Sequence, residues 1–202
     1  MKKAVLSQAQ GRLKLAERAF VALCNSEPDR ETFDINWLDF LVQWKGTYTK
    51  VQQAAKDGPR ETQWFGAVNK ERRNDPLLRY LYEARNDGEH GSEASAKHSP
   101  NSVKFTSYGK RVGIKVNPSG GIYLGPDGKP VVWDDGKIVE SVAFDPAESK
   151  LFEVAERDSA KKVPPPTSHL GSPMEPKPYI AADLGLKWLR SLVATAVAMS
   201  EP

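Results

Sequence analysis

Apolar residues recur every three or four positions through much of the first hundred residues, which is the period of amphipathic helices. The first stripe consists of Leu6, Ala9, Leu13, Ala16, Phe20 and Leu23. The second begins near Asp34 and consists of Trp37, Leu41, Trp44, Tyr48, Val51 and Ala55. Each stripe predicts a helix with one buried face, the first ending at residues 25–28 and the second at residues 57–59, where turn formers gather.

Two further helices are expected before residue 100. A short third helix follows Pro59, since proline suits the first helical position, and a basic cluster comes after it. Its apolar residues are Trp64, Phe65 and Val68. Asp75-Pro76 predicts the start of a fourth helix with Asp75 as its N-cap. That helix should end near Gly88 or Gly91. Because the connections between the later helices are short, residues 1–100 are expected to form an antiparallel helical bundle with its tryptophans in the core.

The pattern changes beyond residue 100 to the two-residue period of β-strands. The alternating residues are Val112, Ile114 and Val116, with further apolar runs at 122–124, 131–133 and 138–144. Turn formers separate these runs at 117–121, 126–128 and 134–136. The pattern predicts a small antiparallel β-meander over residues 101–160. A meander of this size is too small to be secure alone, so it is expected to pack on the bundle.

The last part of the chain combines a proline-rich stretch with one more helix. Residues 161–179 contain Pro164, Pro165, Pro166, Pro173, Pro176 and Pro178, which indicates an extended linker. Residues 180–202 predict a C-terminal helix that docks on the bundle or on a partner. Its apolar face consists of Ala182, Leu186, Leu189, Val193 and Ala196. The expected fold class of the whole chain is therefore α+β.

Composition narrows the function classes. The chain has 202 residues with 39% hydrophobic and 27% charged residues, as globular proteins do, and a net charge of +3. That charge is compatible with a polyanionic partner but does not by itself predict one. The single cysteine, Cys24, cannot form an intramolecular disulfide, so a reducing cytoplasm is expected. The histidines are scattered, so we expect no metal site and no cofactor, and no stretch predicts a signal peptide or a membrane span.

The most informative residue choice lies in the fourth helix. Arg85 occupies a position where the apolar stripe through Leu78 and Leu81 would continue. A buried guanidinium is costly unless it is paired or faces a ligand. His90 follows five residues later. Cleaving RNA without a metal needs a proton-transfer group of near-neutral pKa and a fixed cation on the phosphate, which histidine and arginine supply.

The segment Arg85-Asn86-x-x-x-His90 resembles the Arg-polar-x(3–5)-His motif of the HEPN superfamily (higher eukaryotes and prokaryotes nucleotide-binding domain). The resemblance covers the helical part of the chain only. It implies a bundle of four or five helices and, in many members, a metal-independent endoribonuclease of toxin or defence type. Two copies of the motif usually meet in a homodimer to form one site. Arg85 would then contact the scissile phosphate and His90 would be the acid or base.

Other residues have supporting parts in this interpretation. Asn86 would hold His90 or the backbone in place, since the two are four residues apart. A neighbouring patch for RNA would comprise Lys70, Arg72, Arg73, Arg79 and Tyr82. His169 would line the site if its loop crosses the bundle. Gly88 weakens the helix inside the motif, and positions five apart on a regular helix diverge by about 140°, so a distorted helix or a second subunit must bring Arg85 and His90 together.

Plainer interpretations stay open. Arg85 would pair with Glu89 four residues on, and His90 would be a helix-end cap or a surface residue. His98 would be solvated, and Cys24 would be a small core or helix-end residue. The alternative function is a non-catalytic HEPN-like scaffold that dimerises through the bundle and recognises a partner with the β module. A structural protein of a mobile element is a third hypothesis. The expected partners are RNA, a second copy of the chain and a cognate protein, with no membrane.

Overall fold

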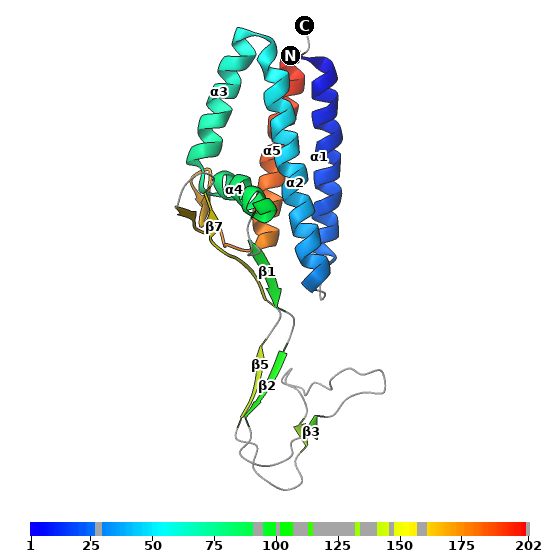
Figure 1. Cartoon of the computed structure of the whole chain (residues 1–202), viewed down its shortest axis with the longest axis vertical. Helices are drawn as coiled ribbons and strands as arrows, with labels where there is room; N and C mark the ends of the chain where they lie inside the picture. The colour runs from blue at the N-terminus through cyan, green and yellow to red at the C-terminus, as the bar shows by residue number, and fades with distance from the viewer. Residues whose placement is uncertain are drawn as a thin grey trace. The chain divides into compact units, whose positions relative to one another are not determined.

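A computed structural model describes residues 1–26, 30–90, 95–99, 102–106, 113–114, 132–133, 141–145, 148–156 and 161–200. The chain divides into two compact units. The helical unit comprises residues 1–98 and 149–202, and the inserted unit comprises residues 99–148. The inserted unit therefore interrupts the helical unit between its fourth and fifth helices. Figure 1 shows the helices and strands of each unit.

Three long helices form the main layer of the helical unit. They are α1 (Lys3–Cys24), α2 (Arg30–Ala54) and α5 (Pro178–Ser200), and they lie side by side along most of their lengths (Figure 1). The first and last predicted helices are confirmed, and α5 docks on α1 and α2 of its own chain. The second helix begins four residues earlier than the sequence pattern indicated, because the fully buried Phe33 extends its apolar face toward the N-terminus.

Two further helices complete the unit. A short 3-10 turn, η1 (Ala55–Asp57), leads into α3 (Pro59–Asn74), and α4 (Pro76–His90) follows after a single residue. Pro59 occupies the start of α3 as predicted, and Gly58 before it has an extended backbone, with φ −152°. Helix α3 is longer than predicted and includes the basic cluster, because Arg72 within that cluster packs inside the unit. Asp75 caps α4 by accepting a hydrogen bond from the Leu78 amide at 2.9 Å.

Aromatic residues of α2 form the centre of the core. Trp44 stacks on Tyr48 and on Trp188 of α5, with ring centroids 6.4 and 5.8 Å apart. The Trp44 indole also donates to the carbonyl oxygen of Gly185 at 2.9 Å. A glycine at this position lets α5 pass close to α2. The prediction that Trp37 and Trp44 belong to the core is confirmed, and Trp64 is partly buried against the core's edge.

Short strands cover one end of the helical unit. They are β1 (Ala96–Ser99) paired with β6 (Glu148–Leu151), β7 (Val154–Ala155) paired with β8 (Lys162–Val163), and β9 (Ser168–His169) paired with β10 (Ser172–Pro173). Strands β7, β8 and β9 pack on α4. The stretch predicted to be an extended linker, residues 161–179, instead contains β8 and the β9–β10 hairpin, and β8 and β9 pack on α4.

The inserted unit contains two described strand pairs. Strand β2 (Ser102–Thr106) pairs with β5 (Ser141–Asp145), and β3 (Gly113–Ile114) pairs with β4 (Val132–Trp133), both antiparallel. The antiparallel character is as predicted, but these pairings are nested, whereas a meander would join consecutive strands. The predicted run at 122–124 lies outside the described residues. The fold class is α+β, and no helix in the described part of the chain is long and apolar enough to span a bilayer.

Candidate functional site

Helix α4 carries the sequence-predicted motif at its C-terminal end. The helix is continuous from Pro76 to His90, so the motif sits on regular helical backbone. The Arg85 side chain is half-buried. The side chains of Glu89 and His90 lie outside the described residues, so the predicted Arg85–Glu89 pair and the role of His90 stay predictions. On a regular helix, backbone positions 85 and 90 lie about 140° apart around the helix axis.

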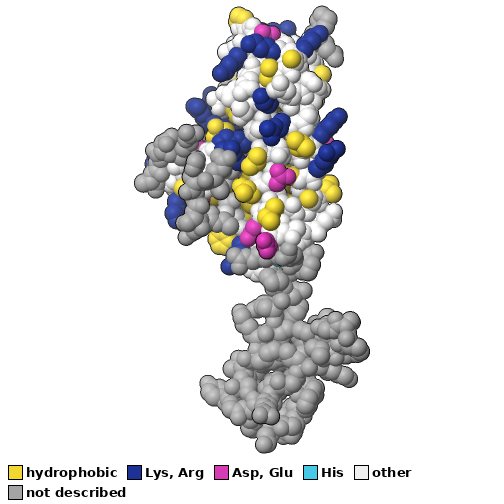
Figure 2. Space-filling model, turned by 45° about the vertical axis from the view of Figure 1, so that its right-hand side comes forward, with side chains coloured by type: hydrophobic (Ala, Val, Ile, Leu, Met, Phe, Trp, Pro, Cys, Tyr) yellow, Lys and Arg dark blue, Asp and Glu magenta, His cyan; other side chains and the backbone are white. Residues whose placement is uncertain are grey.

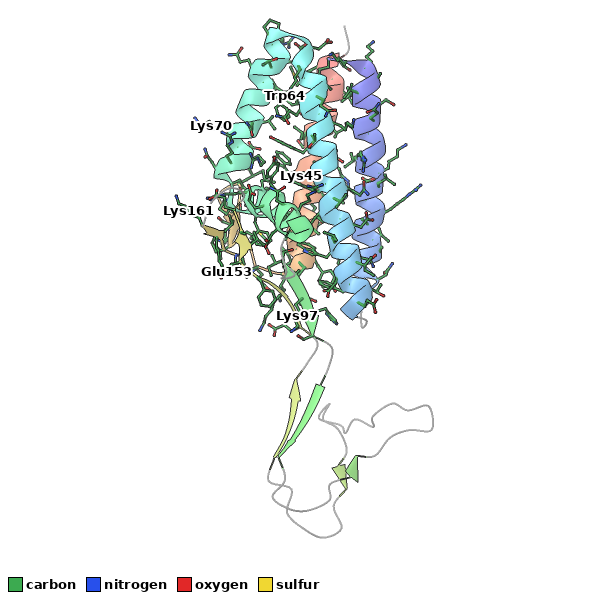
Figure 3. All side chains as sticks on the ribbon, in the orientation of Figure 1. Lys45, Trp64, Lys70, Lys97, Glu153 and Lys161 are labelled. Carbon is green, nitrogen blue, oxygen red and sulfur yellow. The ribbon has the colours of Figure 1, made fainter. Side chains whose placement is uncertain are left out.

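Asn86 is fixed from two sides. It is 7% exposed, and its amide nitrogen donates to Oε2 of Glu83 at 3.0 Å. Its amide oxygen accepts a hydrogen bond from Nζ of Lys45 on α2, which Figure 3 labels. Its described partners are Lys45 and Glu83; the expected role of Asn86 in holding His90 or the backbone stays a prediction. A buried charge is tolerated when it is paired and hydrogen-bonded, so this chain of contacts fixes α4 against α2 beside the motif.

A second cluster surrounds Tyr82, one turn before the motif. The Lys45 ammonium lies 4.4 Å and the Arg72 guanidinium 4.1 Å from the centre of the Tyr82 ring. Arg72 is 7% exposed and donates to Oδ1 of Asn69 at 3.2 Å, while its Nε has no partner among the described residues. Cation–π contacts of desolvated groups contribute about 2 kcal/mol. The cluster therefore ties α2, α3 and α4 together.

The five residues of the predicted RNA-binding patch fall into two groups. Arg72 and Tyr82 contact each other, and Arg79 forms an ion pair with Glu156 at 2.7 Å. Lys70 and Arg73 are exposed on α3, and Lys70 lies on its outer side in Figure 3. The sequence analysis placed all five in one patch because helical spacing alone does not show which basic residue packs inside. Among these five residues, Lys70 and Arg73 are exposed, and the Arg79 side chain is partly exposed but paired with Glu156.

His169 lies at the other end of α4 from Arg85. Its Nδ1 is 3.0 Å from Oδ1 of Asp75, and the Leu170 amide donates to Oδ2 of Asp75 at 2.6 Å. Asp75 caps the start of α4, ten residues before Arg85, which is about 15 Å along a helix at 1.5 Å per residue. The loop does cross onto the helices, as one interpretation required, but His169 fixes the β9–β10 hairpin there and does not line a site around Arg85.

His98 is the buried histidine that the sequence interpretation missed. It was expected in solvent and is 1% exposed. Its Nδ1 lies 2.8 Å from the Ser149 hydroxyl, its ring packs against Phe33 in a tilted geometry with centroids 5.6 Å apart, and its Nε2 has no partner among the described residues. The alternation along β1, in which Ala96 and His98 are buried and Lys97 is exposed, was the available signal. It was too short to recognise without the pairing strand.

The remaining polar residues do not build a metal or thiol centre. The described residues contain no group of three or more His, Cys, Asp or Glu side chains placed to hold a metal ion. Cys24 is exposed at the end of α1, and partial burial of its thiol, with a smaller effect of Asp183, raises its pKa. A raised pKa lowers the thiolate fraction at neutral pH, so Cys24 is a weak nucleophile.

The comparisons give no relative from which a site could be transferred. Neither the family models, nor the curated proteins, nor the solved structures include a match to this chain. What can be said of function therefore rests on the residues of α4 and their surroundings. Three charged residues surround this part of α4. Glu83 lies two residues before Arg85 and bonds to Asn86, Lys45 also bonds to Asn86, and Arg72 packs on Tyr82. Such a concentration of buried charge is typical of functional sites.

Proposed function

We propose that the helical unit is an HEPN-like, metal-independent endoribonuclease whose chemistry depends on Arg85 and His90 of α4. The observation that carries the proposal is the half-buried Arg85 at the end of a helix whose orientation is fixed beside it by the contacts of Asn86 with Lys45 and Glu83. A fixed guanidinium stabilises charge on a phosphate only if its orientation is set before the substrate binds. The buried contacts of Asn86 fix the stretch of helix from which the Arg85 side chain extends.

The regular helix makes the proposal more specific. Since α4 is helical through residue 90, positions 85 and 90 of one chain lie about 140° apart around the helix axis. The site therefore needs two chains, with Arg85 of one copy and His90 of the other on the same phosphate. In the reaction, the 2′-oxygen of the ribose attacks the phosphorus as its proton is removed, and the departing 5′-oxygen takes up a proton. His90 serves one of these transfers. With RNA as the substrate, we expect the protein to act in the cytoplasm.

The test is cleavage of a labelled single-stranded RNA by the purified chain in excess EDTA. Arg85→Ala and His90→Ala are each expected to lower the cleavage rate at least about 100-fold, because proton transfer and charge stabilisation each contribute on that scale. Arg60→Ala removes an exposed guanidinium at the other end of α3 and should leave the rate unchanged. Mixing the Arg85→Ala and His90→Ala proteins should restore part of the activity if two chains build one site.

A second candidate function is favoured by a different observation. Arg72, Arg79 and Tyr82, three of the five residues assigned to RNA contact, are engaged in contacts within the helical unit. That arrangement suits a rigid, non-catalytic HEPN-like scaffold that presents the inserted unit, residues 99–148, to a partner. A folded wild-type chain with no cleavage in EDTA, and no RNA binding at micromolar concentration, would favour this scaffold and remove the nuclease.

A further inference from the structure

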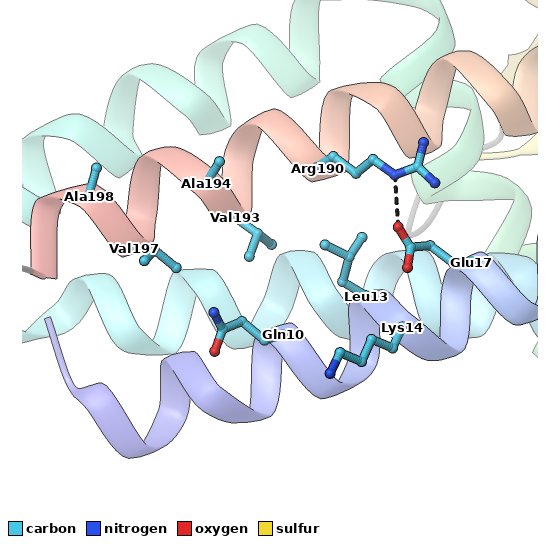
Figure 4. A pocket seen from close by; sticks show the side chains of 9 residues that line it. All are labelled: Gln10, Leu13, Lys14, Glu17, Arg190, Val193, Ala194, Val197 and Ala198. Atoms are coloured by element: carbon cyan, nitrogen blue, oxygen red, sulfur yellow. Dashed lines mark hydrogen bonds and ion pairs between the residues drawn. The ribbon is translucent and has the colours of Figure 1, made fainter.

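A groove lies between α1 and α5 of the helical unit (Figure 4). Its volume is about 570 Å³. Leu13, Val193 and Val197 form its floor, and the exposed Ala194 and Ala198 form one wall. Small side chains on that wall keep the groove open, because larger ones at these exposed positions would fill it. The floor is therefore an apolar surface that a partner can cover.

The groove continues along α1. A second hollow of about 490 Å³ shares Lys14 and Glu17 with the first and extends to Val21 and Ala22. Val21 is 57% exposed. From Gln10 to Ala22 the two hollows follow α1 for twelve residues, which is about 18 Å at 1.5 Å per residue. Three turns of a docked helix have the same length.

The rim of the groove is basic. Glu17 and Arg190 form an ion pair across it at 2.8 Å. Lys14 and Arg18 have no ion pair within the described part of the chain. Figure 2 shows the α1 side of the unit, where Lys and Arg side chains predominate over Asp and Glu and lie beside exposed apolar groups. The lining thus carries three cations and one carboxylate around an apolar floor.

We propose that this groove docks an amphipathic helix of a partner protein, with an apolar stripe on the floor and acidic residues facing Lys14 and Arg18. Charge decides between occupants. A second copy of the chain would bring the same basic rim against itself in a symmetric interface, and like charges across an interface are costly. A nucleic acid would leave the apolar floor uncovered. An acidic amphipathic helix satisfies both the floor and the rim.

The probe is a fluorescein-labelled peptide of fourteen residues with leucines at helical spacing and glutamates beside them. A matched peptide has lysines in place of the glutamates. Fluorescence polarisation with the full chain should show at least tenfold tighter binding of the glutamate peptide, and that affinity should fall with added salt. The double variant Lys14→Glu with Arg18→Glu should lose at least tenfold in affinity, and Ala194→Glu should do the same by filling the groove and adding a negative charge.

The controls separate this groove from general adhesion. Lys56→Glu changes an exposed cation on η1 and should bind the glutamate peptide as the wild type does. Circular dichroism should show unchanged helix content in all variants, since Lys14, Arg18 and Ala194 are exposed. Absence of binding at 100 micromolar peptide, equal binding of both peptides, or unchanged binding by the double variant would overturn the proposal. So would a wild-type dimer in sedimentation that Ala194→Glu dissociates, because a second copy would then fill the groove. RNA cleavage at α4 is not required for any of these outcomes.

Discussion

At the scale of single residues, the helical unit is held by polar side chains that each serve two elements. Asp75 caps α4 and binds the β9–β10 hairpin through the Leu170 amide. The Tyr80 hydroxyl lies 2.7 Å from the carbonyl oxygens of Ser95 and Phe152, so α4 is joined to the segments before β1 and after β6. Removing one partner of such a contact destabilises the protein, because the other partner stays buried and unpaired.

Tyr80 gives the unit a defined loss of stability in alkali. Burial raises the pKa of its phenol above the usual value, the hydrogen bond with Phe152 partly offsets this, and Asp87 adds a small increase. The folded chain thus keeps a proton that the unfolded chain loses, and the free energy of unfolding must fall as pH rises above about 10.

Tyr80→Phe should reduce that slope by up to about 1.4 kcal/mol per pH unit. At pH 8 it should cost about 1–2 kcal/mol, since the buried carbonyls lose their donor. Urea unfolding of both proteins at pH 8 and pH 11 measures the two effects. An equal drop between these pH values in wild type and variant would show that another group causes the alkaline loss.

At the scale of elements, close packing decides which helix positions tolerate a side chain. A Cβ at Gly185 would overlap Cδ1 of Leu81 and lie 3.2 Å from Nε1 of Trp44, whereas a Cβ at Gly66 on α3 would meet nothing within 4 Å. Both glycines lie within helices, so replacing either one by alanine gives the same gain in helix propensity. The difference between them is therefore a measure of tertiary packing alone.

Gly185→Ala is expected to lower the free energy of unfolding by about 1–3 kcal/mol, because the new methyl group forces α5 away from α2 and α4. Gly66→Ala should raise it by about 0.5–1 kcal/mol through helix propensity. Thermal or urea unfolding of the matched pair tests the packing of α5. If both substitutions stabilise the protein, α5 does not pass as close to Trp44 as described.

The β9–β10 hairpin turns through two residues of positive φ, Leu170 at 46° and Gly171 at 79°. A turn of this kind prefers Asn or Gly at its first central position. Leu170 is 57% exposed, so its side chain contributes little burial.

Leu170→Asn should therefore stabilise the protein by about 0.5–1 kcal/mol by relieving the backbone strain. Leu170→Ala removes the same exposed side chain without that relief, so it should change stability by less than about 0.5 kcal/mol. The two midpoints in urea give the comparison. Equal effects of both variants would mean that loss of the leucine side chain, and not φ, controls stability here.

At the scale of the whole molecule, the inserted unit enters and leaves through one strand pair. Strands β1 and β6 are hydrogen-bonded neighbours, and Nδ1 of His98 on β1 lies 2.8 Å from the hydroxyl of Ser149 on β6. The ends of the helical unit at the insertion are thus already close together. A short turn can join two antiparallel strands at such a place.

Replacing residues 100–147 by Asn-Gly should leave a folded helical unit whose free energy of unfolding is within about 1 kcal/mol of the full chain. Circular dichroism and urea unfolding measure this. Loss of cooperative unfolding would show that the inserted unit is needed for the helical core. The same shortened chain should keep RNA cleavage under the nuclease proposal and lose partner recognition under the scaffold alternative.

The sequence alone determined the helices, because their apolar stripes and the Asp75-Pro76 start signal are local patterns. It also indicated the change near residue 100, where turn residues and a two-residue period replace helical spacing. No local sequence pattern indicated that Arg72 packs on Tyr82, that Asn86 binds Lys45, or that residues 161–177 lie against α4. Those contacts depend on which residues distant in sequence come together and replace their bound water by each other. Only the tertiary structure decides them, because the cost of burying a charge or an amide is met by its partner and not by its neighbours in the chain.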